Sequence, residues 1–299
     1  MAIQSVKATI NGQTYTLTYN GTTGKYEATL TAPTITSFNK EGGYYGVTVE
    51  ATDQAGNVTT KDSADSSYRL VVKEKVPPVI SNLSPAANAR VTTASPKITG
   101  TITDEVNGSG VDTTTFVLKV DGVAVNNANV TFTPVTNGYN FSYQTSSLAQ
   151  GSHTFTVDCK DNDGNAAMQK SISFTVDTIA PSLNVTAPAE GYITNQTSLT
   201  VSGTTSDATS SPVVVTIKLN GADQGTVNVS SGAFSKAITL SKEGANSIEV
   251  KVTDSAGLST TITRNITLDT IAPTITGIEL VPNPVDAGAT YIIKVTAAD

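Results

Sequence analysis

The side chains best suited to chemistry in this 299-residue sequence are carboxylates, and those that could act together lie between residues 104 and 177. Ca²⁺ takes six to eight oxygen ligands. The acidic residues that could gather near one end of a β-sandwich and supply them are Asp104, Glu105, Asp112, Asp161, Asp163 and Asp177. Residues 161–165 do not form an EF-hand loop, because the glycine comes too early and no glutamate occupies the twelfth position. Calcium is therefore the one cofactor for which the sequence offers a candidate site.

A simpler explanation of the same turn stays open. Asp and Asn side chains commonly hydrogen-bond the backbone of their own turn, so Asp161 and Asn165 could have that role alone. A calcium site predicts order that a chelator removes, whereas turn hydrogen bonds predict a melting curve that EDTA leaves unchanged.

Catalytic chemistry has little support in the sequence. His153 is the only histidine and Cys159 the only cysteine, too few for the nitrogen and sulfur ligands that zinc usually takes. A Ser-His-Asp arrangement around His153 would arise easily by chance in a chain rich in hydroxyl groups. Cys159 falls on the inward side of an alternating strand, which indicates a small buried side chain. We predict no catalytic residues and no enzyme.

One sequence pattern occurs three times in the chain. It consists of an alternating strand, a turn that begins with aspartate, a second strand and a proline-containing junction. The turns start at Asp53, Asp161 and Asp254, and the junctions end at Pro78, Pro181 and Pro273. Turn signals recur about every 8 to 12 residues and no helical period is present, which is typical of all-β sandwiches. We predict an all-β, rod-like array of sandwiches at residues 1–75, 76–177 and 178–269, followed by a partial domain at 270–299.

The first segment lacks two strands, and the last segment consists of two strands only. The hairpin turn at Asn11 corresponds to those at Asp121 and Asn220 but comes much earlier in its segment, so the first copy lacks its first two strands. Residues 270–299 hold two strands only, and a two-stranded piece is not stable alone in water. We predict head-to-tail assembly by strand addition, with the assembly residues Tyr291, Ile292, Ile293 and Val295. The alternative is that the first domain is a smaller variant and the tail docks locally or frays.

The charge balance excludes several partners. A net charge of −7 and a pI of about 4.7 disfavour binding to nucleic acid or to anionic membranes, which need a basic face. The sequence holds no apolar run long enough for membrane insertion. Residues 1–4 lack the basic and apolar regions of a signal peptide, so we expect a protein that is not exported by that route.

These landmarks resemble the bacterial Ig-like repeat domains of surface adhesins and phage virion proteins. The matching motifs are residues 101–104, 108–112, 120–122, 161–165 and 177–181; residues 5–12, 51–57 and 282–289 are most similar to Ig-like proteins of phage tails in Gram-positive bacteria. The resemblance implies tandem Ig-like β-sandwiches with no shared active site. The third domain departs from the pattern, because Leu258 stands where Asn165 stands and residues 206–209 lack the glycine-rich element. We expect any site built on those residues to be absent there.

The resemblance implies a non-enzymatic structural protein of a phage virion, such as a tail fibre, decoration or filament subunit. Its partners would be copies of itself or other virion proteins. The alternative is a cell-surface adhesin or carbohydrate-binding stalk, located outside the cell or at its surface, with a host surface glycan as partner. Tyr44 and Tyr45 could form its binding face, although tyrosines more simply fill the core of a small domain.

Overall fold

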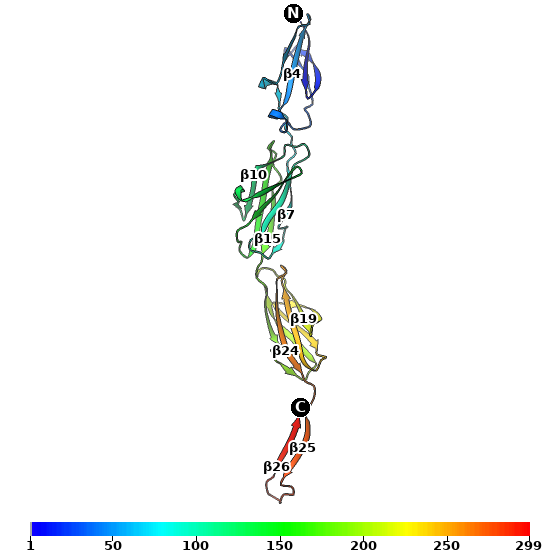
Figure 1. Ribbon diagram of the computed structural model, residues 1–299, viewed down its shortest axis with the longest axis vertical. Coiled ribbons are helices and arrows are strands. Elements are labelled where there is room, and N and C mark those ends of the chain that lie inside the picture. The colour runs from blue at the N-terminus through cyan, green and yellow to red at the C-terminus, as the bar shows by residue number, and fades with distance from the viewer. Residues whose placement is uncertain (1) are drawn as a thin grey trace. The chain divides into compact units, whose positions relative to one another are not determined.

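The second segment folds into two stacked β-sheets (Figure 1). In the computed structural model, which describes residues 2–299, the sheet orders are β11-β10-β14-β15-β8 and β12-β13-β9-β7. The strands are β7 (Val79–Ser84), β8 (Arg90–Val91), β9 (Lys97–Thr103), β10 (Val111–Val120), β11 (Val123–Ala124), β12 (Thr131–Val135), β13 (Gly138–Gln144), β14 (Gly151–Asp161) and β15 (Lys170–Val176). A short 3₁₀ turn, η3 (Asn127–Asn129), precedes β12.

The period-two pattern of β14 builds the core of this sandwich. Successive side chains of a strand point to opposite faces, and Phe155, Val157 and Cys159 are 0%, 0% and 2% exposed. Burial raises the pKa of the Cys159 thiol to about 12, and the nearby carboxylates of Asp158, Asp161 and Asp104 add to the effect. The cysteine is thus an inert core residue, as its place in the pattern predicted.

The third segment repeats the two-sheet arrangement, with orders β16-β18-β22-β21 and β17-β24-β23-β19-β20. Its strands are β16 (Ser182–Ala187), β17 (Ile193–Thr194), β18 (Ser198–Ser206), β19 (Val214–Leu219), β20 (Ala222–Val227), β21 (Val229–Ser230), β22 (Ala233–Thr239), β23 (Gly244–Thr253) and β24 (Ser259–Leu268). Ile248, Val250 and Val252 of β23 are fully buried, in the same alternation as on β14. The prediction of an all-β fold of tandem sandwiches is therefore confirmed.

The first segment has one main sheet instead of two, in the order β3-β2-β1-β4-β5, with β6 beside β4. Its strands are β1 (Ile3–Ile10), β2 (Gln13–Asn20), β3 (Lys25–Glu27), β4 (Tyr45–Asp53), β5 (Val58–Lys61) and β6 (Arg69–Leu70), and its 3₁₀ turns are η1 (Glu41–Gly43) and η2 (Ser66–Tyr68). Val47 and Val49 match Phe155 and Val157 in the repeat, yet they are only half-buried. Among the described residues, no second sheet covers this face.

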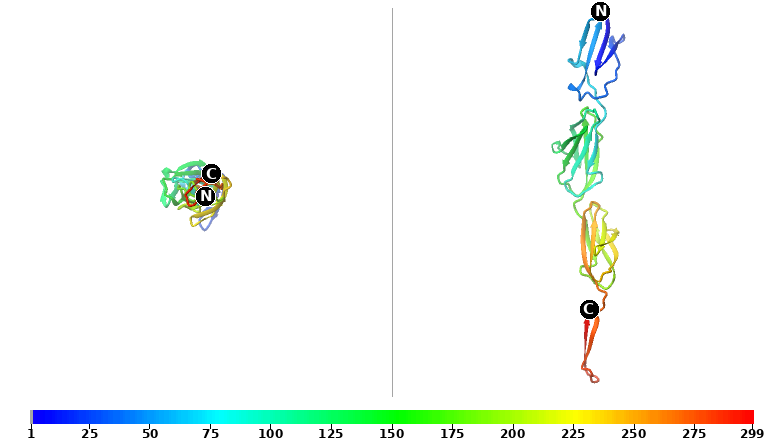
Figure 2. Two further views of the ribbon diagram at one scale, coloured as in Figure 1. Left: turned by 90° about the horizontal axis from the view of Figure 1, so that it is seen from below. Right: turned by 45° about the vertical axis from the view of Figure 1, so that its right-hand side comes forward.

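Residues 274–298 form a separate hairpin of β25 (Thr274–Val281) and β26 (Ile292–Ala298), which pair only with each other (Figure 2). The boundary between the two compact units of the chain lies between Val176 and Asp177. No helix in residues 2–299 has the length and apolar character needed to cross a membrane.

Candidate metal centres

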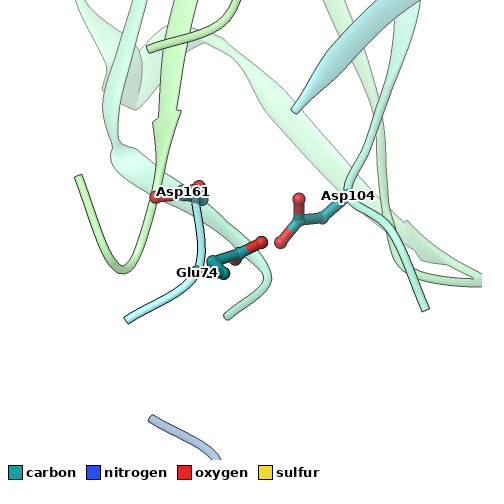
Figure 3. A group of neighbouring side chains, drawn as sticks. All are labelled: Glu74, Asp104 and Asp161. Atoms are coloured by element: carbon teal, nitrogen blue, oxygen red, sulfur yellow. The ribbon is translucent and has the colours of Figure 1, made fainter. Parts of the chain in front are cut away.

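Three carboxylates converge at one end of the second sandwich. Glu74 lies in the junction after β6, Asp104 directly follows β9, and Asp161 is the last residue of β14. One oxygen from each lies within 4.8 Å of the others. Figure 3 shows Glu74 and Asp104 directed toward each other, with Asp161 beside Glu74. The junction and two strand ends, far apart in sequence, thus form one acidic group, which we call the Glu74 group.

Backbone amides hold these side chains in place but do not satisfy them. Gly110 N donates to Asp104 Oδ2 at 2.7 Å, and Ser109 N donates to Glu74 Oε1 at 2.5 Å. The other oxygens, Asp104 Oδ1 and Glu74 Oε2, are buried without a hydrogen-bond partner. Asp104 as a whole is only 7% exposed. Because an unpaired buried charge is strongly unfavourable, the group needs either protons or a cation.

Glu105 shows how the crowding is relieved when no cation is bound. Burial raises the pKa of Glu105 to about 8, and hydrogen bonds shared with Glu74 and Asp104 add to the rise. Burial also opposes ionisation of Glu74, but hydrogen bonds from Glu105 and Ser109 lower the pKa of Glu74 overall. Glu105 Oε2 is itself buried without a hydrogen-bond partner, so protonation of Glu105 would reduce the negative charge gathered here.

The third sandwich contains a second group at the matching positions: Asp177 in the junction, Asp207 after β18 and Asp254 after β23. One oxygen from each lies within 4.8 Å of the others. Asp177 is 0% exposed, and its Oδ2 has no hydrogen-bond partner. The same holds for the buried Oδ2 of Asp254 and Oγ of Ser210. The structure therefore places a carboxylate group, here called the Asp177 group, where the sequence predicted none.

Local hydrogen bonds explain why this second group forms despite the different sequence. Asp254 Oδ1 accepts from the amides of Ala256 at 2.8 Å and Leu258 at 2.9 Å. Only the backbone of Leu258 is used, so the missing asparagine side chain does not alter the turn. Asp207 Oδ1 likewise accepts from the amides of Thr209 and Ser210. The loop after β18 thereby replaces the glycine-rich element of the second sandwich.

The predicted calcium ligands separate into three sets. Asp104 and Asp161 belong to the Glu74 group, with Glu105 beside it, and Asp177 belongs to the other group. Asp112 lies on β10, accepts from the backbone amide and hydroxyl of Thr114, and joins neither group. Asp163 joins neither group and instead accepts from Thr36 Oγ1 at 2.5 Å and Glu74 N at 3.0 Å.

Sequence reasoning missed Glu74, Asp207 and Asp254. Position within the repeat is the signal that could have found them. In each complete copy one acidic residue begins the junction, a second directly follows β9 or β18, and a third begins the turn after β14 or β23. Matching position to position across repeats would have identified all three residues despite the changed sequence around them.

The donor chemistry of both groups suits calcium. All six side chains of the two groups are carboxylates, whose oxygens are the ligands that hard divalent cations prefer. Calcium tolerates irregular geometry and completes its shell with backbone carbonyls and water. Zinc fits poorly, because His153 and Cys159 belong to neither group.

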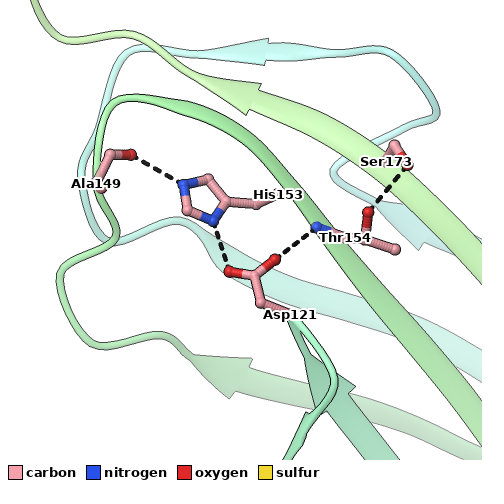
Figure 4. A network of polar contacts seen from close by, with 5 residues as sticks. All are labelled: Asp121, Ala149, His153, Thr154 and Ser173. Atoms are coloured by element: carbon pink, nitrogen blue, oxygen red, sulfur yellow. Dashed lines mark hydrogen bonds and ion pairs between the residues drawn. The ribbon is translucent and has the colours of Figure 1, made fainter.

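His153 makes a different polar network (Figure 4). Its Nδ1 lies 2.7 Å from Asp121 Oδ2 and its Nε2 lies 2.9 Å from Ala149 O. Both ring nitrogens therefore face acceptors, and the neighbouring hydroxyls of Thr154 and Ser173 bond to each other at 3.1 Å. In the part of the chain that the structure describes, both ring nitrogens are engaged by Asp121 and Ala149 and neither contacts a hydroxyl, so the arrangement does not work as a Ser-His-Asp triad.

This network predicts a pH-dependent contribution to stability. Burial opposes protonation, but the hydrogen bonds to Asp121 and Ala149 raise the pKa of His153 overall. Burial also opposes ionisation of Asp121, yet its contacts with His153 and Thr154 lower the pKa of that carboxyl. The ion pair therefore stabilises the fold between the unfolded pKa values of about 3.9 and 6.5. This stabilisation is lost as pH rises through the folded pKa of His153 or falls through that of Asp121.

We expect the second sandwich to lose about 1 kcal/mol of unfolding free energy between pH 5.5 and 8.5 through this pair, since Asp121 is partly exposed. Urea unfolding of wild type and His153→Gln at both pH values measures it. Glu105 titrates in the same range in both proteins, so the pH difference should be smaller in the variant by about that amount; an equal difference in both proteins would contradict the assignment.

The tyrosines proposed as a glycan platform are occupied by the fold. Tyr45 is 5% exposed, and its hydroxyl donates to Ile35 O at 3.0 Å. The Arg69 guanidinium lies over the Tyr44 ring, 4.6 Å from its centroid. Stacking of a sugar on these two rings would require both contacts to be displaced.

Two family models match the two complete sandwiches. Residues 79–178 match the bacterial Ig-like domain, and residues 181–270 match domain B of glucodextranase. These matches support an Ig-like repeat protein.

The curated relatives are much longer than this chain. The PII-type proteinase of Lactococcus lactis subsp. cremoris is 28% identical over 239 residues, which is 74% of this chain and 12% of that protein. Bacillopeptidase F of Bacillus subtilis is 32% identical over 131 residues, 44% of this chain and 9% of that protein. The chain thus spans about an eighth or less of these relatives.

Solved structures show only a general likeness. The fibronectin(III)-like modules of Clostridium thermocellum CbhA are 17% identical, with a TM-score of 0.40, covering 64% of this chain and 94% of theirs. A Ca²⁺-stabilised, ice-binding adhesin of an Antarctic bacterium is 19% identical, with a TM-score of 0.33, covering 95% of this chain and 69% of its own.

Proposed function

We propose that this Ig-like repeat protein is a non-enzymatic structural spacer whose second and third sandwiches are stabilised by bound calcium. One observation carries the proposal: each complete sandwich brings three carboxylates within reach of one ion and leaves buried oxygens without partners. The same arrangement forms twice from different local sequences, so it depends on position in the repeat.

The position of each group suggests what the ion would do. Glu74 and Asp177 lie in the junctions that lead into the second and third sandwiches, whereas their partner carboxylates lie on strand ends and turns. An ion held by all three would fix the junction to the sandwich that follows it. The sandwiches would then act as ordered spacers, which matches a chain without a catalytic constellation in its described residues.

An enzymatic role has weaker support. Both ring nitrogens of the single histidine are engaged by a carboxylate and a carbonyl, and the single cysteine is buried with a raised pKa. The proteinase relatives share a small fraction of their length with this chain. We therefore assign no proteolytic step to these residues.

Removing calcium tests the proposal. Differential scanning calorimetry of the full chain should show the transitions of the second and third sandwiches falling by more than about 10 °C in EGTA, relative to a hundredfold excess of calcium over its Kd. Asp112 belongs to neither group, so Asp112→Asn should keep the full shift and serves as the matched control. Superimposable scans with calcium and EGTA would overturn the proposal.

We further propose where this spacer is located. Residues 5–12, 51–57 and 282–289 favour a phage virion surface through their resemblance to Ig-like tail proteins. The alternative setting is the bacterial cell surface, with the sandwiches serving as a stalk. Antibody labelling of purified virions and of intact cells distinguishes them, and labelling of cells alone would exclude the virion.

A further inference from the structure

The loops that border the two carboxylate groups differ in length. In each complete sandwich, the amide of the residue after the turn aspartate donates to a carbonyl of this loop at 3.0 Å. The acceptor is Gly110 O in the second sandwich and Ser210 O in the third. Gly110 comes six residues after Asp104, whereas Ser210 comes three residues after Asp207. The two loops therefore reach the same point of the turn with different side chains beside the carboxylates.

The longer loop brings a fourth carboxylate to the Glu74 group. Glu105 directly follows Asp104, and its Oε2 is buried without a hydrogen-bond partner, as are Asp104 Oδ1 and Glu74 Oε2. A Cβ atom added at Gly108 would lie 2.6 Å from Asp104 Oδ2 and 2.9 Å from Glu105 Cδ, so both carboxyl groups lie against this glycine. Three carboxylates of this group thus each have a buried oxygen that could take a cation as its partner.

The shorter loop supplies a hydroxyl in place of this carboxylate. The residue after Asp207 is Ala208, which has no side-chain ligand to offer. Ser210 is 0% exposed, and its Oγ has no hydrogen-bond partner. The Ser210 amide donates to Asp207 Oδ1 at 2.5 Å, and its carbonyl accepts from Ser255 Oγ at 2.7 Å, next to Asp254. The backbone of Ser210 is therefore bonded to both loops that carry the strand-end carboxylates of the Asp177 group, and its buried hydroxyl lies near them.

We propose that Glu105 and Ser210 complete the ligand sets of their respective groups, and that the Glu74 group therefore binds calcium more tightly than the Asp177 group. This inference rests on the proposed function and names further ligands for the same two sites. Four carboxylates carry one more negative charge than three carboxylates and a hydroxyl, and the affinity of calcium sites depends on the number of charged ligands.

Burial strengthens this difference. Charges interact more strongly away from water, and each group contains a side chain that is at least nine-tenths buried and has an unpartnered oxygen, Asp104 in one and Ser210 in the other. Repulsion among four carboxylates raises the free energy of the empty Glu74 group, and a bound cation relieves it. The same reasoning makes the Glu74 group the stronger site for a trivalent ion such as La³⁺.

Titration calorimetry of full-length chains with one group disabled tests the order of affinity. Asp177→Asn leaves the Glu74 group as the only complete group, and Asp104→Asn leaves the Asp177 group. At pH 8.5, above the pKa of about 8 of Glu105, the first chain should bind calcium at least about tenfold more tightly than the second. Equal or reversed affinities would overturn the order. Absence of calcium binding in both chains would refute the proposed function itself.

Further substitutions in these two chains test the ligands. Beside Asp177→Asn, Glu105→Gln should weaken calcium binding by about 10- to 100-fold and La³⁺ binding by a larger factor. Beside Asp104→Asn, Ser210→Ala should weaken calcium binding by only about three- to tenfold, because water can replace a neutral ligand. Asp112→Asn, which changes a carboxylate outside both groups, should leave the affinity of either chain unchanged.

Thermal unfolding in EGTA distinguishes a ligand from a residue with a structural role only. Neither Glu105→Gln nor Ser210→Ala should lower the melting temperature of its sandwich in EGTA, because the oxygens concerned have no partner to lose. Both variants should reduce the rise in melting temperature that calcium produces. An equal fall with and without calcium, or an unchanged calcium affinity, would overturn the assignment of that residue as a ligand but leave the two calcium sites of the proposed function intact.

Discussion

Replacing Phe155 with alanine is expected to lower the free energy of unfolding of the second sandwich by about 3–5 kcal/mol. The ring is 0% exposed and packs near Phe174, with 6.2 Å between the ring centroids. Truncation therefore loses burial and also leaves a cavity between the two sheets. Urea unfolding followed by tyrosine fluorescence measures the change.

Two matched variants show whether burial under the second sheet causes this loss of stability. Thr156→Ala, on the other face of β14, should change stability by less than about 0.5 kcal/mol. Val47 occupies the matching position of the half-covered first domain. Per carbon atom deleted, Val47→Ala should lower the free energy of unfolding clearly less than Phe155→Ala does. An equal loss per deleted carbon at Val47 would contradict the account of an open face.

Replacing Asp177 with asparagine is expected to have opposite effects with and without calcium. In EGTA the variant should be more stable than wild type by about 1–3 kcal/mol, because a buried, unpartnered anionic oxygen is removed. With calcium at about a hundredfold excess over its Kd, the variant should be less stable by roughly 2–3 kcal/mol, because it lacks the ion. Denaturant titrations in the two buffers measure both signs.

Asp223→Asn is the matched control for this reversal. Asp223 lies in the same sandwich and is exposed, and its Oδ1 accepts from Gly225 N. Its replacement should give the same small change in both buffers. A change of one sign in calcium and EGTA for Asp177→Asn would mean that the carboxylate is a structural hydrogen-bond acceptor and holds no ion.

The fold could be predicted because its determinants are local and repeated. The alternation through Phe155, Val157 and Cys159 requires a strand with one buried face, and the asparagine-glycine turn at residues 11–12 favours a hairpin. The pattern could not show whether a second sheet covers the apolar face of each strand. Val47 has the same alternation as Phe155, but its exposure depends on whether a second sheet lies opposite.

The metal groups were only partly predictable because their residues come from distant segments. Asp104 and Asp161 stood out in motifs rich in Asp and Gly, whereas Glu74 stood in a junction next to lysines. Asp163 has the right chemistry in the right turn, yet its side chain bonds to Thr36 and the Glu74 amide. Composition shows that carboxylates are present; only the strand register shows which of them meet.

Isothermal titration of calcium into the chelator-stripped full chain tests the central claim most directly. The account predicts two calcium ions per chain, one for each carboxylate group. Asp104→Asn and Asp177→Asn should each remove one of them, while Asp112→Asn should remove neither. Absence of saturable calcium binding, or binding that survives loss of both Asp104 and Asp177, would contradict it.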